Sequence, residues 1–122
     1  MSKTILIADD EPSLRLLVKA TLKSRNYTIV EAVNGQDALK LAEQLVPDLV
    51  LLDVMMPLMT GFQVCSEMRK IEKTKNIAVI ILTAKGGAED RNTAISAGAN
   101  HFLTKPFSPP ELLKAVDEIL AV

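Results

Sequence analysis

The acidic residues of this chain are placed where they could bind a metal ion. Asp9, Asp10 and Glu11 directly follow the apolar run ILIA, and Asp53 directly follows the apolar run LVLL. Burying an ionised carboxylate without a partner costs free energy, and neighbouring acids add to that cost. Mg²⁺ would offset the charge, because it binds a few carboxylate oxygens and leaves positions for a phosphate. The pattern therefore indicates a magnesium site, with Mn²⁺ as an alternative ion.

Three further side chains would suit phosphoryl chemistry at such a site. A carboxylate can attack phosphorus and form an aspartyl phosphate when the charge on the phosphoryl oxygens is neutralised. Asp53 is the best-placed acceptor. Beside the metal, the ammonium of Lys105 could pair with one phosphoryl oxygen, and the hydroxyl of Thr83 could donate to another.

Each of these residues alone also has an ordinary structural explanation. Asp10 and Glu11 could cap a helix and favour its dipole, with Pro12 in the first turn. Thr83 could simply end a strand, and a lone lysine is usually a solvated surface charge. Asp53 is harder to explain in this way, because the apolar residues that follow it do not lead the chain into water.

The surrounding elements are predicted to bring these residues to one edge of a sheet. Short β-branched or leucine-rich runs are typical of strands, and they occur at residues 4–8, 27–31, 49–52, 77–82 and 101–103. Helical patterns alternate with them at residues 14–22, 36–44, 62–70, 89–97 and 112–120. This α/β alternation predicts an open, doubly wound parallel sheet, in which ligands bind at the carboxyl ends of the strands.

The composition limits the classes of protein that fit. A length of 122 residues suits one domain, so we expect a single domain over residues 1–122. With 14 basic and 15 acidic residues the net charge is −1, which predicts no direct contact with nucleic acid. The single cysteine, Cys65, favours a reducing compartment and hence the cytoplasm. Asp53 and Pro57 interrupt the most apolar region, so we expect no membrane partner.

The order of the motifs resembles that of response-regulator receiver domains, the family that includes the chemotaxis response regulator. The resemblance rests on Asp9-Asp10, on PDLVLLDVMMP around Asp53, on ILTA around Thr83 and on AGANHFLTKPF around Lys105, and it covers essentially the whole chain. It implies a flavodoxin-like three-layer α/β/α fold with five parallel strands in the order 2-1-3-4-5.

The resemblance also implies a role for each site residue. Asp53 would accept a phosphoryl group from a histidine kinase or a small phosphodonor. Magnesium would be held by Asp10, Asp53 and the backbone carbonyl of Met55, with Asp9 acting mainly through a bound water. The peptide bond between Lys105 and Pro106 would be cis and would aim the ammonium inward.

The resemblance implies a conformational switch as well. Thr83 would move toward the phosphoryl group, and Phe102 would rotate inward behind it as a purely steric switch. Met55 and Lys85 hold the positions that flank the approach of hydrolytic water in this family, and neither is suited to orient it. We therefore expect a self-phosphorylating acceptor that loses its phosphoryl group slowly, rather than a turnover enzyme.

The expected partners follow from the same family. The donor would be a sensor histidine kinase or a phosphotransfer protein. The output would be a downstream protein that docks on the face formed by the fourth helix, the fifth strand and the fifth helix. Family relatives that dimerise carry acids before the fifth strand, where this chain has Asn100 and His101. We therefore expect a monomer, with dimerisation upon phosphorylation left open.

Three other functions share parts of this pattern. A flavodoxin-like cofactor domain would have a hydroxyl- or glycine-rich loop after the first strand, where this chain has DDEPS. A phosphohydrolase of the haloacid dehalogenase type places its two acids two residues apart, whereas Asp9 and Asp10 are adjacent. A receiver-like interaction module that never accepts phosphate would not need the complete set of acids, threonine and lysine.

Overall fold

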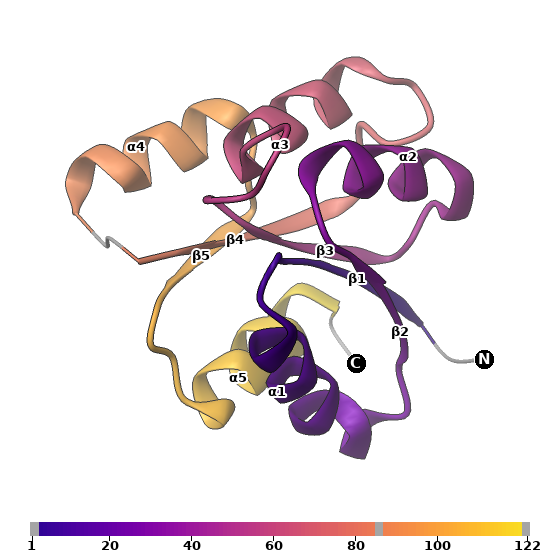
Figure 1. Ribbon diagram of the computed structural model, residues 1–122, viewed down its shortest axis with the longest axis vertical. Coiled ribbons are helices and arrows are strands. Elements are labelled where there is room, and N and C mark those ends of the chain that lie inside the picture. Colours follow the sequence, from indigo (N-terminus) through magenta and orange to yellow (C-terminus); the bar gives the residue numbers. More distant parts are fainter. Residues whose placement is uncertain (1–2, 85–86, 121–122) are drawn as a thin grey trace.

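A computed structural model describes residues 3–84 and 87–120, in which five parallel strands form one sheet. The order of the strands is β2-β1-β3-β4-β5 (Figure 1). The strands are β1 (Thr4–Ala8), β2 (Thr28–Ala32), β3 (Leu49–Asp53), β4 (Ala78–Thr83) and β5 (His101–Thr104). The predicted strand order is confirmed.

Helices cover both faces of this sheet (Figure 1). They are α1 (Pro12–Leu22), α2 (Gly35–Leu45), α3 (Gly61–Lys70), α4 (Ala88–Ala97) and α5 (Pro109–Leu120). In Figure 1, α1 and α5 lie below the sheet, and α2, α3 and α4 lie above it. The three-layer α/β/α arrangement is therefore confirmed. A short 3₁₀ turn, η1 (Lys23–Arg25), extends α1 and was not predicted.

Alternate residues of the central strands build two separate cores. Leu6 and Val50 belong to the core under α2, α3 and α4, whereas Ile7 and Leu51 belong to the core under α1 and α5. All five residues of β3 are buried. A shift of one residue in the pairing would send each side chain to the opposite core, so burial on both faces fixes the register.

The register brings the ends of four strands to the same edge. Ala8 of β1 pairs with Leu52 of β3, Asp53 pairs with Leu82 of β4, and Thr83 pairs with Thr104 of β5. The residues that end β1, β3, β4 and β5 therefore lie side by side, as the sequence predicted.

Close backbone packing holds the segment after β3. A Cβ atom built on Gly61 would clash with the carbonyl oxygen of Asp53, so only glycine fits there. Thr60 and Gln63 form a capping box that satisfies backbone donors at the start of α3. The loop that leaves Asp53 is thus held in a fixed position at the start of α3.

Within the described ranges, no helix combines the length and the apolar character needed to span a bilayer.

Candidate functional site

Three acidic side chains meet at the carboxyl edge of the sheet. Asp9, Asp10 and Asp53 each offer a carboxylate oxygen, and these oxygens all lie within 4.8 Å of one another. Asp9 is fully buried and Asp53 is 5% exposed, whereas Asp10 is exposed. The cluster therefore has a buried base and an opening toward solvent on the side of Asp10.

Lys105 is the basic residue that enters this cluster. Its Nζ donates to Oδ1 of Asp53 at 2.7 Å and to Oδ2 of Asp9 at 3.1 Å. It follows the end of β5 directly, and its peptide bond to Pro106 is cis. The side chain is 19% exposed, so the ion pairs are partly shielded from water.

Burial and charge shift the protonation of this pair. Burial raises the pKa of Asp53. The hydrogen bond from Lys105 works against this rise, and the charge of Asp9 adds to it. Burial favours the neutral form of Lys105, but the hydrogen bond and charge of Asp53 and the charge of Asp9 together raise the pKa of this ammonium. Three carboxylates thus face one ammonium group, and the site carries excess negative charge.

The donor atoms fit a hard divalent cation. Both oxygens of Asp9 already accept hydrogen bonds, from the backbone of Glu11 and from Lys105. In contrast, Oδ2 of Asp53 and both oxygens of Asp10 accept no hydrogen bond from the part of the chain that the structure describes. Carboxylate oxygens that are close together and unused by the protein are suitable ligands for Mg²⁺.

The helix-capping interpretation of the acidic triplet explains little of this geometry. Glu11 is the N-cap residue of α1, but its side chain makes no capping hydrogen bond. Pro12 does occupy the first turn, as expected. The carboxylates of Asp9 and Asp10 belong to the cluster with Asp53 instead.

Thr83 lies at the same edge but its hydroxyl is directed to a different partner. It is the last residue of β4 and is 3% exposed. Its Oγ1 donates to Oδ2 of Asp90, in the first turn of α4, at 3.0 Å. The structure thus brings Asp9, Asp53 and Lys105 into direct contact, whereas the hydroxyl of Thr83 is engaged by α4.

Phe102 lies on β5, on the side of the sheet that α4 covers. Its half-buried ring packs against the core of that side. The guanidinium of Arg91 lies over the ring, 4.9 Å from its centre. Asp90 and Arg91 were not singled out from the sequence, because acids and bases near a helix start are ordinarily solvated.

The loop after Asp53 is exposed and partly apolar. Met55 is 73% exposed, and Leu58 is 68% exposed with a φ of 72°, in the left-handed region that favours glycine. The role of the Met55 carbonyl as a metal ligand stays a prediction. Lys85, the other residue expected to flank the hydrolytic water, lies outside the described residues.

The fold and the site together define a class of protein. A five-stranded parallel sheet of this order, covered by helices on both faces, is the CheY-like form of the flavodoxin-like fold. The family model of the response regulator receiver domain matches residues 5–117, and the chain belongs to this family. Family membership favours the receiver over a flavin-binding domain or a phosphohydrolase.

Relatives and solved structures agree with this assignment. The DNA-binding dual master transcriptional regulator RpaA of Synechocystis is 42% identical over 116 residues, which are 95% of this chain and 48% of RpaA. Chemotaxis protein CheY4 of Vibrio cholerae is 32% identical with a TM-score of 0.92, over 98% of this chain and all of that one. The receiver domain of sensor histidine kinase PA1611 from Pseudomonas aeruginosa, solved with magnesium in its active-site cleft, is 29% identical with a TM-score of 0.91 over both whole chains.

The prediction about partners is wrong. From the net charge of −1 we expected no nucleic-acid partner, yet RpaA is a DNA-binding regulator and PhoP of Bacillus subtilis, another relative, is a transcriptional regulatory protein. The chain spans about half the length of the curated relatives it matches. The charge of a receiver domain therefore says nothing about a DNA-binding output. The expected protein-only output falls with this prediction, whereas the monomeric state stays a prediction.

Proposed function

We propose that the chain is the phospho-acceptor of a two-component system, with Asp53 as the residue that takes the phosphoryl group from a histidine kinase. The observation that supports this proposal most strongly is the state of the Asp53 carboxylate. One oxygen, Oδ1, is held by Lys105 at 2.7 Å, and the other, Oδ2, accepts no hydrogen bond from the described residues. The side chain is therefore fixed in position while one oxygen remains able to act as a nucleophile.

The proposed step is a direct displacement at phosphorus. Oδ2 of Asp53 donates an electron pair to the phosphorus of a phosphohistidine, and the bond between phosphorus and the imidazole nitrogen breaks. The imidazole keeps that electron pair and takes a proton from solvent. Lys105 orients the acceptor before the transfer and pairs with a phosphoryl oxygen after it.

A divalent ion would be held by this chain's own oxygen atoms. The carboxylates of Asp10 and Asp53 and the carbonyl of Met55 would bind it directly, and Asp9 would act through a water. When bound, magnesium supplies the positive charge that neutralises the phosphoryl oxygens. The magnesium-bound receiver domain of PA1611 supports this assignment for the present chain.

The same residues support a switch rather than a turnover enzyme. After the transfer, Thr83 would donate its hydroxyl to a phosphoryl oxygen, and Phe102 would move inward behind it. Met55 is a thioether in an exposed loop and only a weak hydrogen-bond acceptor, so it is poorly suited to orient a hydrolytic water. We therefore propose slow loss of the phosphoryl group and a signalling role.

Two relatives, RpaA and PhoP, are transcriptional regulators, which supports transcription as the output that this receiver controls. In such an arrangement, phosphorylation of the receiver sets the activity of a DNA-binding part. The contact with DNA is assigned to that output and not to the residues of the receiver.

The proposed function is tested by incubation with acetyl phosphate, with and without Mg²⁺, followed by measurement of the intact mass. The wild type should gain one phosphoryl group only with Mg²⁺, and Asp53→Ala should gain none. Asp37→Asn, a change of an exposed acid on α2, is the control and should behave as the wild type. If the wild type gains no phosphoryl group from either acetyl phosphate or a phosphorylated histidine kinase, the chain is a receiver-like interaction module that never accepts phosphate.

A further inference from the structure

We propose that the first turn of α4 is a latch that holds the unphosphorylated state, with Asp90 retaining the hydroxyl of Thr83 and Arg91 retaining the ring of Phe102. This inference rests on the proposed function, since both retained groups are those that would move when Asp53 is phosphorylated. It concerns how strongly the chain resists that movement.

The contact between Asp90 and Thr83 competes directly with phosphoryl binding. Oγ1 of Thr83 donates to Oδ2 of Asp90 at 3.0 Å, and Asp90 is half-buried. A hydroxyl has one proton, so Thr83 can donate it to Asp90 or to a phosphoryl oxygen, but not to both. Because the acceptor is a carboxylate, the hydrogen bond is stronger than one to a neutral group. The hydrogen bond to Asp90 must break before Thr83 can donate its hydroxyl proton to a phosphoryl oxygen.

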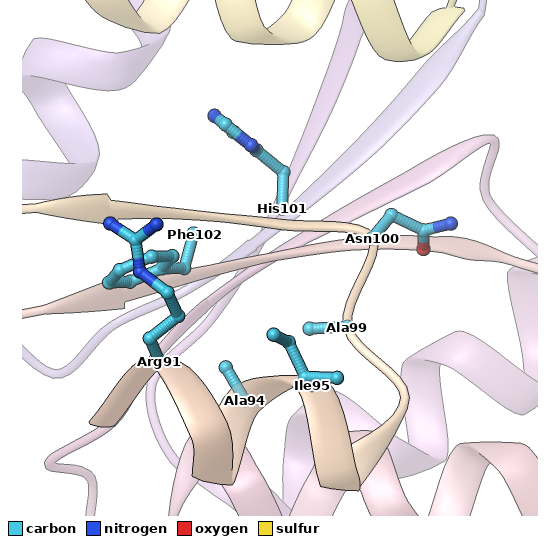
Figure 2. A pocket seen from close by; sticks show the side chains of 7 residues that line it. All are labelled: Arg91, Ala94, Ile95, Ala99, Asn100, His101 and Phe102. Carbon is cyan, nitrogen blue, oxygen red and sulfur yellow. The ribbon is translucent and has the colours of Figure 1, made fainter. Parts of the chain in front are cut away.

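The contact between Arg91 and Phe102 acts on the second group. Figure 2 shows Arg91 rising from α4 with its guanidinium in front of the Phe102 ring, and the distance to the ring centre is 4.9 Å. A cation over an aromatic face at this distance is attracted by the ring. Arg91 is exposed, so this attraction is weaker than a buried one would be. It favours the ring position seen here over a position from which the ring has rotated away.

The two contacts matter because the start of α4 buries no side chain of its own, whereas its end is held by hydrogen bonds from α3 to the carbonyls of Ala97 and Gly98. Ala94 is the buried residue of α4 within the described chain, and Ile95 is 64% exposed. The neighbouring α3, in contrast, buries Val64, Cys65 and Met68. Elements with few buried apolar contacts open and shift at low cost in free energy. The side-chain contacts of consecutive residues 90 and 91 therefore make up a large part of what positions the start of α4.

The latch should lower the apparent affinity for a phosphoryl mimic. A protein whose binding-competent state is only partly populated binds with an affinity reduced by that fraction. Asp90→Ala removes the acceptor and should tighten binding of beryllofluoride about tenfold or more, the change expected for one charge-assisted hydrogen bond. Asp90→Asn keeps an uncharged acceptor and should tighten it by about half as much on a logarithmic scale.

The experiment is a titration of the 122-residue chain with beryllofluoride in excess Mg²⁺, followed by amide NMR spectra. Glu89→Ala is the matched control, because it removes an exposed acid from the same turn of α4 that has no hydrogen bond to Thr83. Its affinity should equal that of the wild type. In a Thr83→Ala background, Asp90→Ala should no longer tighten binding, because the hydroxyl that it releases is gone.

Arg91 is tested in the same titration. Arg91→Ala should tighten binding about twofold, and Arg91→Lys, which keeps the positive charge, should fall between that variant and the wild type. The ring resonances of Phe102 should change in Arg91→Ala before any beryllofluoride is added.

The outcomes separate the latch from the proposed function. Equal affinities for Asp90→Ala, Glu89→Ala and the wild type would overturn the latch and leave the phospho-acceptor intact. A tightening by Asp90→Ala that persists in the Thr83→Ala background would also overturn it, since the effect would then be one of charge alone. A wild type that does not bind beryllofluoride would overturn the proposed function and the latch with it.

Discussion

Replacing Asp10 by Asn should stabilise the metal-free protein, although it changes a residue of the proposed site. Two unit charges 4.8 Å apart repel by about 0.9 kcal/mol in a water-like dielectric. Asp10 faces two carboxylates at this range or closer, those of Asp9 and Asp53, and Lys105 offsets part of their charge. The net gain should be about 1 kcal/mol, which raises the melting temperature of a domain of this size by about 4 °C.

The assay is thermal unfolding followed by circular dichroism, first with a chelator and then with Mg²⁺ in excess. Binding to the folded state alone raises the melting temperature, so Mg²⁺ should stabilise the wild type. Asp10→Asn should lose most of this stabilisation, because a neutral amide oxygen replaces a charged carboxylate ligand. The wild type and the variant should therefore approach each other, or exchange order, when Mg²⁺ is added.

Glu89→Gln provides the control for general charge effects. It removes the same unit of charge at the first turn of α4, where an acid favours the helix dipole. Its melting temperature should equal that of the wild type or fall slightly, and its response to Mg²⁺ should be unchanged. A metal-free Asp10→Asn that is no more stable than the wild type would refute the electrostatic account of the cluster.

Three other changes test separate parts of the structure. Gly61→Ala should lower the free energy of unfolding in urea by about 2 kcal/mol or more, because its Cβ would meet the carbonyl of Asp53. Gly87→Ala meets nothing within 4 Å and should cost less than about 1 kcal/mol, the loss expected for alanine at the N-cap of α4. Hydrogen bonds from Lys19 and Arg15 of α1 lower the pKa of Glu31 from its ordinary value of 4.5. The Glu31 carboxylate therefore contributes its full stabilisation above pH 4.5, and this stabilisation is lost as the pH falls through the lower pKa of the folded state. Glu31→Gln should thus have a melting temperature slightly below that of the wild type at pH 7, which corresponds to less than about 1 kcal/mol of stability. The two melting temperatures should be equal near pH 3, and a difference that persists in acid would contradict this assignment. Met55→Asn should speed the loss of the phosphoryl group in a mass-spectrometric time course, and an unchanged rate would contradict the role given to Met55.

The strands of this fold could be predicted closely because each is a short apolar run bounded by polar residues. Residues 49–52 were predicted as a strand, and the observed β3 extends this range by Asp53 alone. The beginnings of helices were less predictable. α5 begins at Pro109 rather than at residue 112, because prolines are tolerated in a first turn, where backbone N–H groups have no helical partner.

The meeting of the acids with Lys105 could also be anticipated, since strand ends in a parallel sheet share an edge. The contacts of α4 could not. Asp90 and Arg91 look like ordinary exposed charges in the sequence, and only the packing of α4 against β4 and β5 gives them partners. Likewise, the net charge of one domain could not reveal that relatives carry a DNA-binding output.

The central claim is that Asp53 forms an acyl phosphate through Oδ2, the oxygen that accepts no hydrogen bond from the described residues. Treatment of the phosphorylated chain with borohydride converts an aspartyl phosphate to homoserine, and peptide mass spectrometry then locates the converted residue. The account predicts homoserine at position 53 after incubation with acetyl phosphate and Mg²⁺, and none when Mg²⁺ is omitted. Homoserine at another acid, with Asp53 unmodified, would contradict it.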